Sequence, residues 1–175
     1  MSGKFADFTG TARRVLVACH PKPFDTHWLK AEIMAEEGKN ARYETIDDIS
    51  GGDYTGDILT VYPGNTPKTW VAGHKNTFDS VYLPDCGGEW FELMEERSKA
   101  EAMYTTDLYF MIDRLKVLLK PKGKLYLGKW LTDAKAEAAR VRKLGFAASV
   151  EVKLLGDATF IVLSFDESRD KSGTR

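Results

Sequence analysis

The sequence predicts an α/β fold: a doubly wound, mainly parallel sheet that ends in an antiparallel β-hairpin. Short apolar runs of strand length, at 14–19, 43–46, 78–83 and 124–127, alternate with stretches of helical periodicity. In the segment 148–165, apolar and charged residues instead alternate over 150–154, and a two-residue turn separates them from a more apolar run at 158–165. Repeated strand–helix units are typical of a parallel sheet with helices on both faces, and the final alternation indicates the hairpin.

The first predicted unit is a strand, a helix and a second strand. The run RVLVAC at 14–19 is largely apolar and β-branched, which is typical of a strand buried on both faces. Asp25 or Thr26 can cap the helix that follows, and Gly38 ends it. The second strand, 43–46, ends at a pair of aspartates.

The middle of the chain is rich in turn residues. Glycine and proline recur between 51 and 67, and we predict a short strand around 70–72. The run FDSVYL predicts a strand at 78–83. The segment 89–102 can be helical, and a helix is predicted at 106–119, where apolar residues recur on one helical face.

The last part of the chain begins with a strand at 124–127. Thr132 can cap the next helix, which Gly145 ends. The alternating run at 150–154 and the more apolar run at 158–165 flank a Gly-Asp turn at 156–157, and together they form the predicted hairpin of 148–165.

Composition limits the classes of protein. The chain has 175 residues, 43% of them hydrophobic, and a formal net charge of −1. The apolar fraction excludes a disordered chain, and the length fits one domain, 1–165. The tail 166–175 has no apolar residue, so we expect it to be disordered. A net charge near zero argues against a dedicated nucleic-acid partner.

Segments that mark export or membrane insertion are missing from the sequence. No apolar run approaches the ~18 residues of a membrane helix, and the N-terminus has no apolar core of signal-peptide length. We therefore expect a cytoplasmic protein with no membrane partner. The two cysteines, Cys19 and Cys86, are too few for a disulfide framework, so we expect reduced thiols.

The second half of the chain resembles the class I S-adenosylmethionine-dependent methyltransferases. That family commonly shows a strand that opens with Phe-Asp, a helix that ends in Leu-Lys-Pro-Gly-Gly before a strand, and a helix that ends in Gly-Phe before a terminal hairpin. The matching pieces, in the same order and spacing, are Phe78-Asp79, 119–123 (LKPKG), Gly145-Phe146 and 148–165. The resemblance implies a Rossmann-like fold, with S-adenosylmethionine as cofactor and methyl transfer as activity.

The resemblance also implies where the cofactor binds. The family's first strand ends in a glycine-rich loop, and Ala18, Cys19 and His20 stand at that place here, followed by two prolines within 21–23. Glycine provides a positive φ or a close backbone approach, so this cofactor loop is divergent. At the end of the second strand the family has an acidic residue that binds the ribose hydroxyls, and Asp47 occupies that position.

Asp85 is the candidate catalytic residue. It directly follows the strand 78–83, and ligands of open α/β sheets bind at the carboxyl ends of the strands, where the chain order reverses. There a carboxylate can take a proton from a substrate hydroxyl or amine, or orient it. Two alternatives stay open: Asp85 is a turn residue before two glycines, and Asp47 is a loop acid beside Asp48.

A metal site is not predicted. Cys19, His20, His27 and Cys86 are potential zinc ligands, but the spacing C-H-x6-H is not a recognised zinc pattern. His20 is alternatively a base in the same cleft. Several lysines alternate with acids and indicate a solvated surface: Lys22, Lys68, Lys75, Lys122, Lys124 and Lys129.

Two functions from different classes remain open. The chain is either a methyltransferase that acts on a small molecule, a sugar or a protein side chain, or a catalytically inactive protein of the same fold that serves as a binding or scaffold module. The proline-containing loop 18–24 motivates the second. A nucleotide binder that uses the same cleft is a further alternative. In the first case, the segment 51–68, a second copy of the chain or a partner subunit would recognise the acceptor.

Overall fold

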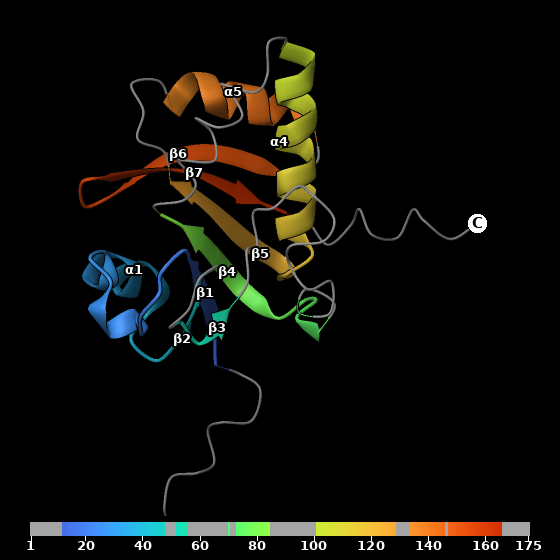
Figure 1. The fold of residues 1–175 in the computed structure, drawn as a ribbon. Coiled ribbons are helices and arrows are strands. Elements are labelled where there is room, and N and C mark those ends of the chain that lie inside the picture. Colours follow the sequence, from blue (N-terminus) through green and yellow to red (C-terminus); the bar gives the residue numbers. More distant parts are fainter. Residues whose placement is uncertain are drawn as a thin grey trace, which may run out of the picture.

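The computed structural model places the strands among the residues that it describes in one seven-stranded sheet, of order β3-β2-β1-β4-β5-β7-β6 (Figure 1). The structure describes residues 12–47, 52–55, 70, 73–84, 101–128, 134–145 and 147–165, with no side-chain description at 55 and 101–107. The strands are β1 Arg14–Ala18, β2 Arg42–Asp47, β3 Tyr54–Thr55, β4 Phe78–Leu83, β5 Leu119–Gly128, β6 Ser149–Leu155 and β7 Ala158–Ser164.

The predicted doubly wound sheet with its terminal hairpin is confirmed. β1 pairs in parallel with both β2 and β4, and β4 pairs in parallel with β5. β7 runs antiparallel to β5 and to β6. The order of the strands reverses between β1 and β4, because the chain moves outward from β1 to β3 and then returns to the other side.

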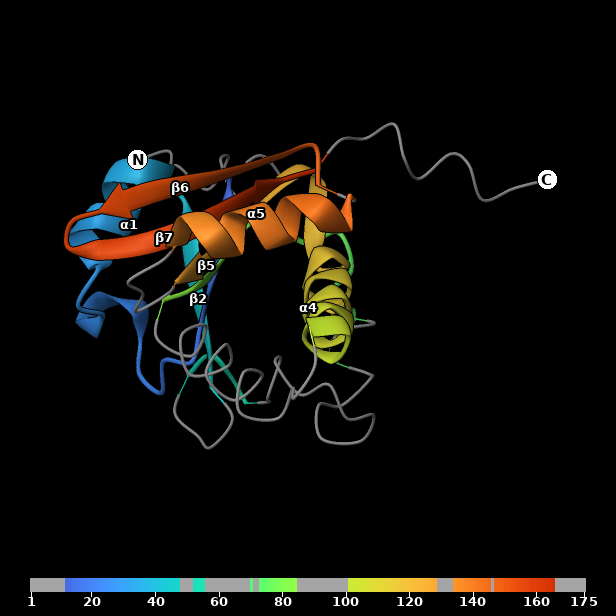
Figure 2. The ribbon, with the colours of Figure 1, turned by 90° about the horizontal axis from the view of Figure 1, so that it is seen from above.

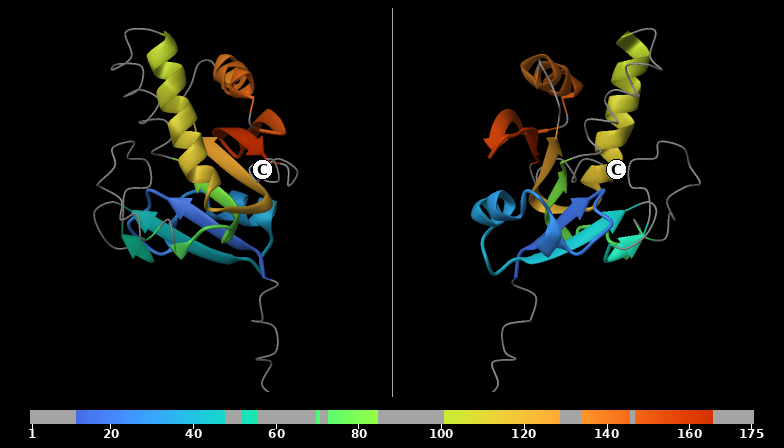
Figure 3. Two further views of the ribbon diagram at one scale, coloured as in Figure 1. Left: turned by 90° about the vertical axis from the view of Figure 1, so that its right-hand side faces the viewer. Right: turned by 60° about the vertical axis from the view of Figure 1, so that its left-hand side comes forward.

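Helices lie on both faces of the sheet, as Figures 2 and 3 show. On one face, the 3-10 helix η1 (Phe24–Thr26) and the helix α1 (Lys30–Glu37) pack on β1, β4 and β5. On the other face lie α4 (Glu101–Lys116) and α5 (Ala134–Leu144). None of the described helices is long and apolar enough to cross a membrane.

Alternate strand residues serve two separate cores, because successive side chains of a strand point to opposite faces. Leu16, Val81 and Leu125 pack toward α4 and α5, together with Leu108 and Ile112 of α4. The neighbouring strand residues pack toward α1 instead, in a second core with α1 and η1: Val15, Val17, Tyr82, Tyr126, Phe160 and Val162. Because both faces of these strands are buried, their sequences are apolar almost without interruption.

The helix predicted after Asp25 or Thr26 begins later than expected. Both residues lie in η1, and α1 begins at Lys30 with Leu29 as an N-cap that makes no side-chain hydrogen bond. The Thr26 hydroxyl donates instead to the carbonyl of Pro23, at 2.9 Å, so it closes the 3-10 turn. The end of α1 is as predicted, since Gly38 adopts a φ of +102°.

Two other element predictions are wrong in part. The helix predicted at 106–119 ends at Lys116, and Leu119 instead pairs with Phe78 in the sheet. The strand predicted around 70–72 is wrong at Trp70, which is helical. The Trp70 ring stacks on the His74 ring with centroids 4.4 Å apart. The two residues are four apart in sequence, which is the spacing at which side chains meet on one face of a helix. Residues 71–72 lie outside the described part of the chain.

Hydrogen bonds between polar side chains join α1 to the sheet beneath it. Glu37 is buried, receives a hydrogen bond from Arg13 at 2.7 Å and another from the Tyr82 hydroxyl at 2.8 Å. Burial and the neighbouring Glu37 carboxylate raise the pKa of Tyr82 far above its ordinary value. The Tyr126 hydroxyl donates to Glu36 at 3.1 Å. These bonds fix the C-terminal end of α1 to β1, β4 and β5.

A second buried carboxylate, Glu44, lies on β2. Arg14 donates two hydrogen bonds to it, at 2.9 and 2.8 Å, and the Tyr54 hydroxyl donates a third at 2.7 Å. Arg42 lies 3.3 Å away. Burial by itself would raise the pKa of Glu44, but the hydrogen bonds from Arg14 and Tyr54 outweigh it and hold the pKa below its ordinary value of 4.5. Glu44 thereby joins β1, β2 and β3.

We expect Glu44→Gln to lower the free energy of unfolding at pH 7 by about 1–3 kcal/mol, because Arg14 loses its charged partner. Since folding depresses the pKa of Glu44, its contribution is present at neutral pH and is lost as the pH falls below 4.5. Urea unfolding from pH 7 to pH 3 should therefore show the wild type and the variant converging. The control is Glu151→Gln, at an exposed glutamate of β6; an equal effect there would contradict the assignment.

Candidate functional site

The carboxyl ends of β1, β2 and β4 lie side by side at one edge of the sheet. Ala18, the last residue of β1, is in register with Ile46 of β2, and Val17 is in register with Tyr82 of β4. This edge is also where the strand order reverses (Figure 1). In open α/β sheets, such a reversal leaves a crevice in which ligands bind.

Four of the predicted site residues are brought together at this edge. The loop after β1 is joined to β2 by a backbone hydrogen bond, in which the His20 N–H donates to the Ile46 carbonyl at 3.3 Å. Ile46 is the residue before Asp47, which ends β2 and is partly buried. Ala18, Cys19 and His20 therefore lie beside Asp47, as the sequence predicts.

Cys19 adopts a backbone conformation that is uncommon for residues other than glycine. Its φ is +60°, in the left-handed region that favours glycine. The loop after β1 thus takes a glycine-type turn without a glycine. Cys19 is also disulfide-bonded, so the expectation of reduced thiols is wrong for this residue. The other cysteine, Cys86, lies outside the described residues.

The imidazole of His20 faces its own loop. Its Nε2 atom lies 3.1 Å from the Thr26 hydroxyl and 3.3 Å from the Pro23 carbonyl. The ring also stands edge-on to His27, with centroids 4.7 Å apart. This side chain therefore stabilises the loop, and its use as a base stays a prediction. Within the part of the chain that the structure describes, no three potential ligands among His, Cys, Asp and Glu could hold a metal.

Thr45 organises the site, although the sequence analysis did not single it out. Its buried hydroxyl lies 3.1 Å from the Lys22 carbonyl and accepts the N–H of Asp53 at 3.1 Å. The Asp53 carboxylate in turn accepts the Thr45 N–H at 2.8 Å. One residue on β2 thereby fixes the loop after β1 and the segment before β3. The available signal was strand periodicity, which puts Thr45 and Asp47 on the same face.

Glycines permit the close approach of segments around this edge. A Cβ on Gly52 would lie 3.1 Å from the His20 carbonyl oxygen, and a Cβ on Gly128 would lie 2.4 Å from that of Pro84. The second contact brings the end of β5 against the end of β4. Asp85, the predicted catalytic residue, follows Pro84 but lies outside the described residues.

A pair of variants tests the left-handed turn at Cys19. Because Cys19→Gly and Cys19→Ala both remove the Cys19 sulfur and with it the disulfide bond, the difference between them isolates the backbone. We expect the glycine variant to be more stable by about 1 kcal/mol, since alanine is strained at a φ of +60°. Urea unfolding measures this. The control is Ala139, an exposed position in α5, where we expect the glycine form to be the less stable one: Ala139→Gly should lower the free energy of unfolding by about 0.5–1 kcal/mol. If glycine were less stable than alanine at both positions, the left-handed turn at Cys19 would be contradicted.

Comparisons with known proteins give fold-level similarity. No family model matches the chain, and no curated protein matches it. The chain is similar to the solved structure of a putative S-adenosyl-L-methionine-dependent methyltransferase from Methanococcus maripaludis, with 12% identity over 90% of this chain and 79% of that chain and a TM-score of 0.43. It is similar to a SAM-dependent methyltransferase from Archaeoglobus fulgidus, with 10% identity over 88% of this chain and 86% of that chain and a TM-score of 0.49. It is also similar to a mutant 16S rRNA (adenine(1408)-N(1))-methyltransferase from Catenulisporales acidiphilia (13%, 90% and 87%, 0.45).

Identities of 10–13% transfer neither a substrate nor a site residue from these proteins. The chain's own strand order, with its single reversal and its antiparallel β7 inserted between β5 and β6, agrees with the fold that the sequence resemblance implied. The chain has the fold of the class I S-adenosylmethionine-dependent methyltransferases.

Proposed function

We propose that the chain is an S-adenosylmethionine-dependent methyltransferase whose cofactor binds at the carboxyl edge of β1 and β2. The observation that carries the proposal is the pairing of Asp47 with the left-handed loop after β1. The His20–Ile46 hydrogen bond holds these two features together on one side of β1, and the strand order reverses on the other side, between β1 and β4. The acceptor is a small molecule, a sugar or a protein side chain.

The residues present suit the ribose end of the cofactor best. The Asp47 carboxylate can accept hydrogen bonds from both ribose hydroxyls. Ala18 is fully buried and small, and the turn at Cys19 allows a close backbone approach. The loop that follows offers few backbone donors, because Pro21 and Pro23 have no N–H and that of His20 is taken by Ile46. We therefore expect Asp47 to contribute a large share of the affinity.

When bound, S-adenosylmethionine supplies a sulfonium methyl group that is already electrophilic. The work left to the protein is to align an acceptor with that group and to remove a proton where the acceptor carries one. Asp85 follows the end of β4 in sequence and is the residue that we assign to the proton. Thr45 is a positioning residue, since its hydrogen bonds fix the two segments on either side of Asp47.

Asp47→Asn tests the cofactor site directly. We expect this variant to bind S-adenosylhomocysteine at least about tenfold more weakly by isothermal titration, because an amide can accept only one of the two hydroxyl hydrogens well. Its melting temperature should stay close to that of the wild type. The matched control is Asp157→Asn, at the exposed turn between β6 and β7. Unchanged affinity in Asp47→Asn would sink the ribose assignment.

The same titration separates the two classes of function. Binding of S-adenosylmethionine and S-adenosylhomocysteine by the wild type supports the enzyme. If the titration shows no heat and the ligand at millimolar concentration causes no thermal shift, the result favours the alternative, a non-catalytic binding or scaffold module that keeps the fold.

Asp85→Asn tests the catalytic assignment. We expect the variant to keep its affinity for S-adenosylhomocysteine and to lose about 10²–10⁴-fold in the rate of methyl transfer, which is the usual size of a general-base contribution. The measurement is the release of S-adenosylhomocysteine with an acceptor present. Full activity in the variant would leave Asp85 with a structural role in the turn.

A further inference from the structure

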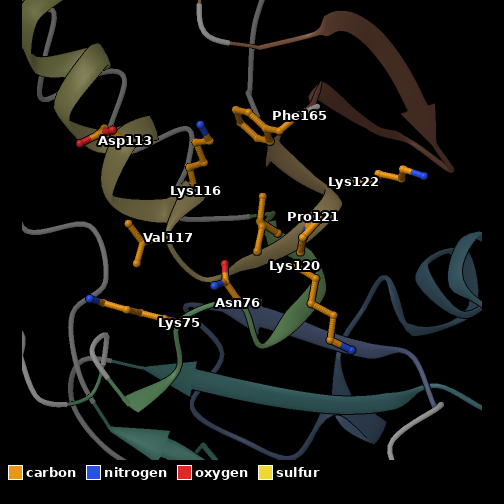
Figure 4. Close-up of a pocket in the computed structure, with 10 residues that line it drawn as sticks. Lys75, Asn76, Asp113, Lys116, Val117, Lys120, Pro121, Lys122 and Phe165 are labelled. Atoms are coloured by element: carbon orange, nitrogen blue, oxygen red, sulfur yellow. The ribbon is translucent and has the colours of Figure 1, made fainter. Parts of the chain in front are cut away.

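A pocket of about 360 Å³ lies at the opposite edge of the sheet from Asp47. It is formed where β4 and β5 begin and where α4 ends, as Figure 4 shows. Its lining comes from the residues before β4, the last turn of α4, the start of β5 and Phe165 after β7. The candidate cofactor site lies at the carboxyl ends of the strands, so the two locations are separate.

The described lining carries four lysines and one carboxylate, Asp113. Lys120 forms an ion pair with Asp79 at 3.2 Å, and Lys116 lies over the Phe165 ring at 5.6 Å. The charge excess is local, because the whole chain has a formal net charge of −1. The sequence pattern predicts a scattered, solvated surface for Lys75 and Lys122, whereas the fold brings both to one cavity.

A bulge in β5 creates this concentration of charge. Between the paired residues Phe78↔Leu119 and Ser80↔Lys124, β4 advances by two positions and β5 by five. The extra residues of β5 project Lys120, Pro121 and Lys122 at the start of the strand. Gly123 permits the bulge, since a Cβ there would lie 2.8 Å from the Lys120 carbonyl oxygen.

Two lining residues adopt a conformation that favours glycine. Asn76 has a φ of +51° and Lys122 a φ of +64°. Asparagine tolerates this region, whereas lysine enters it rarely. A glycine at 122 would form the same bulge without strain. The fold therefore does not require a lysine at this position.

We propose that this pocket binds the phosphate group of a small phosphorylated molecule. Several ammonium point charges gathered at one cavity suit a dianionic phosphate, for which lysine is a common binding residue. The volume lies near the lower limit for small-molecule sites, which favours a compact ligand over a macromolecule. Leu119, Pro121 and Phe165 offer apolar surface to its organic part.

Binding requires movement of the lysines. In Figure 4 the side chains of Lys75 and Lys122 point away from the centre of the pocket. Their stems are flexible, so both ammonium groups can turn toward a dianion. That ordering costs side-chain entropy, so the affinity is modest and falls as the salt concentration rises.

The test uses ribose 5-phosphate, inorganic phosphate and unphosphorylated ribose as probes in isothermal titration at low salt. We expect the wild type to bind ribose 5-phosphate more tightly than inorganic phosphate and not to bind ribose. In Lys122→Gly, which removes the charge and relieves the backbone strain, the affinity should fall about tenfold while the melting temperature does not fall. Lys75→Ala should weaken binding similarly.

The matched control is Lys143→Ala, at an exposed lysine of α5 that is not among the lining residues of the pocket. Equal losses in Lys143→Ala and Lys122→Gly, or unchanged affinity in both pocket variants, would overturn the proposal. Binding of a single-stranded RNA oligonucleotide without binding of ribose 5-phosphate would also overturn it, in favour of a nucleic-acid surface. Binding of S-adenosylhomocysteine, titrated separately, should be unaffected by Lys122→Gly, so the proposal stands or falls independently of the methyltransferase assignment.

Discussion

The parallel pairing of β1 with β2 on one side and with β4 on the other is the constraint on which the rest of the structure depends. It sets all three carboxyl ends at one edge and leaves room there by reversing the strand order. It also sends alternate residues of β1 into two different cores, so Val15, Leu16 and Val17 must all be apolar. The polar groups that interrupt those cores, such as Glu37 with Arg13 and Tyr82, are bonded to one another.

The parts of the fold that were predictable from sequence are those in which local pattern and tertiary packing agree. β1, β4 and the terminal hairpin were found because a strand buried on both faces, or a hairpin about a Gly-Asp turn, has a distinct composition. The prediction failed where two patterns competed. Leu119 fits the helical face of α4, but pairing with Phe78 draws it into β5. Trp70 lies in a region whose composition resembles a loop or a strand, and stacking on His74 favours a helical turn.

At the candidate site, the sequence predicted which residues come together but not the backbone conformation of the loop after β1. Asp47 and the residues 18–20 come together as expected, because strand ends are easily located from the apolar runs. The absence of glycine indicated a changed loop, yet Cys19 reaches the left-handed region despite its side chain. Composition does not reveal such a conformation, since it depends on the surrounding bonds that hold the backbone. Thr45 was missed for a related reason: its role is to bond two loops whose path the sequence does not specify.

The two candidate sites lie at opposite ends of the same strands, and this has a consequence for how they can influence each other. β4 has six residues, so its ends are roughly 20 Å apart. This is more than twice the Debye length of about 8 Å at physiological ionic strength. A phosphate held at the β5 bulge would therefore barely alter the electrostatic potential at Asp47. Communication between the sites would need a mechanical change in the sheet, and a rigid, doubly covered sheet resists it. The two edges are thus free to diverge independently in evolution.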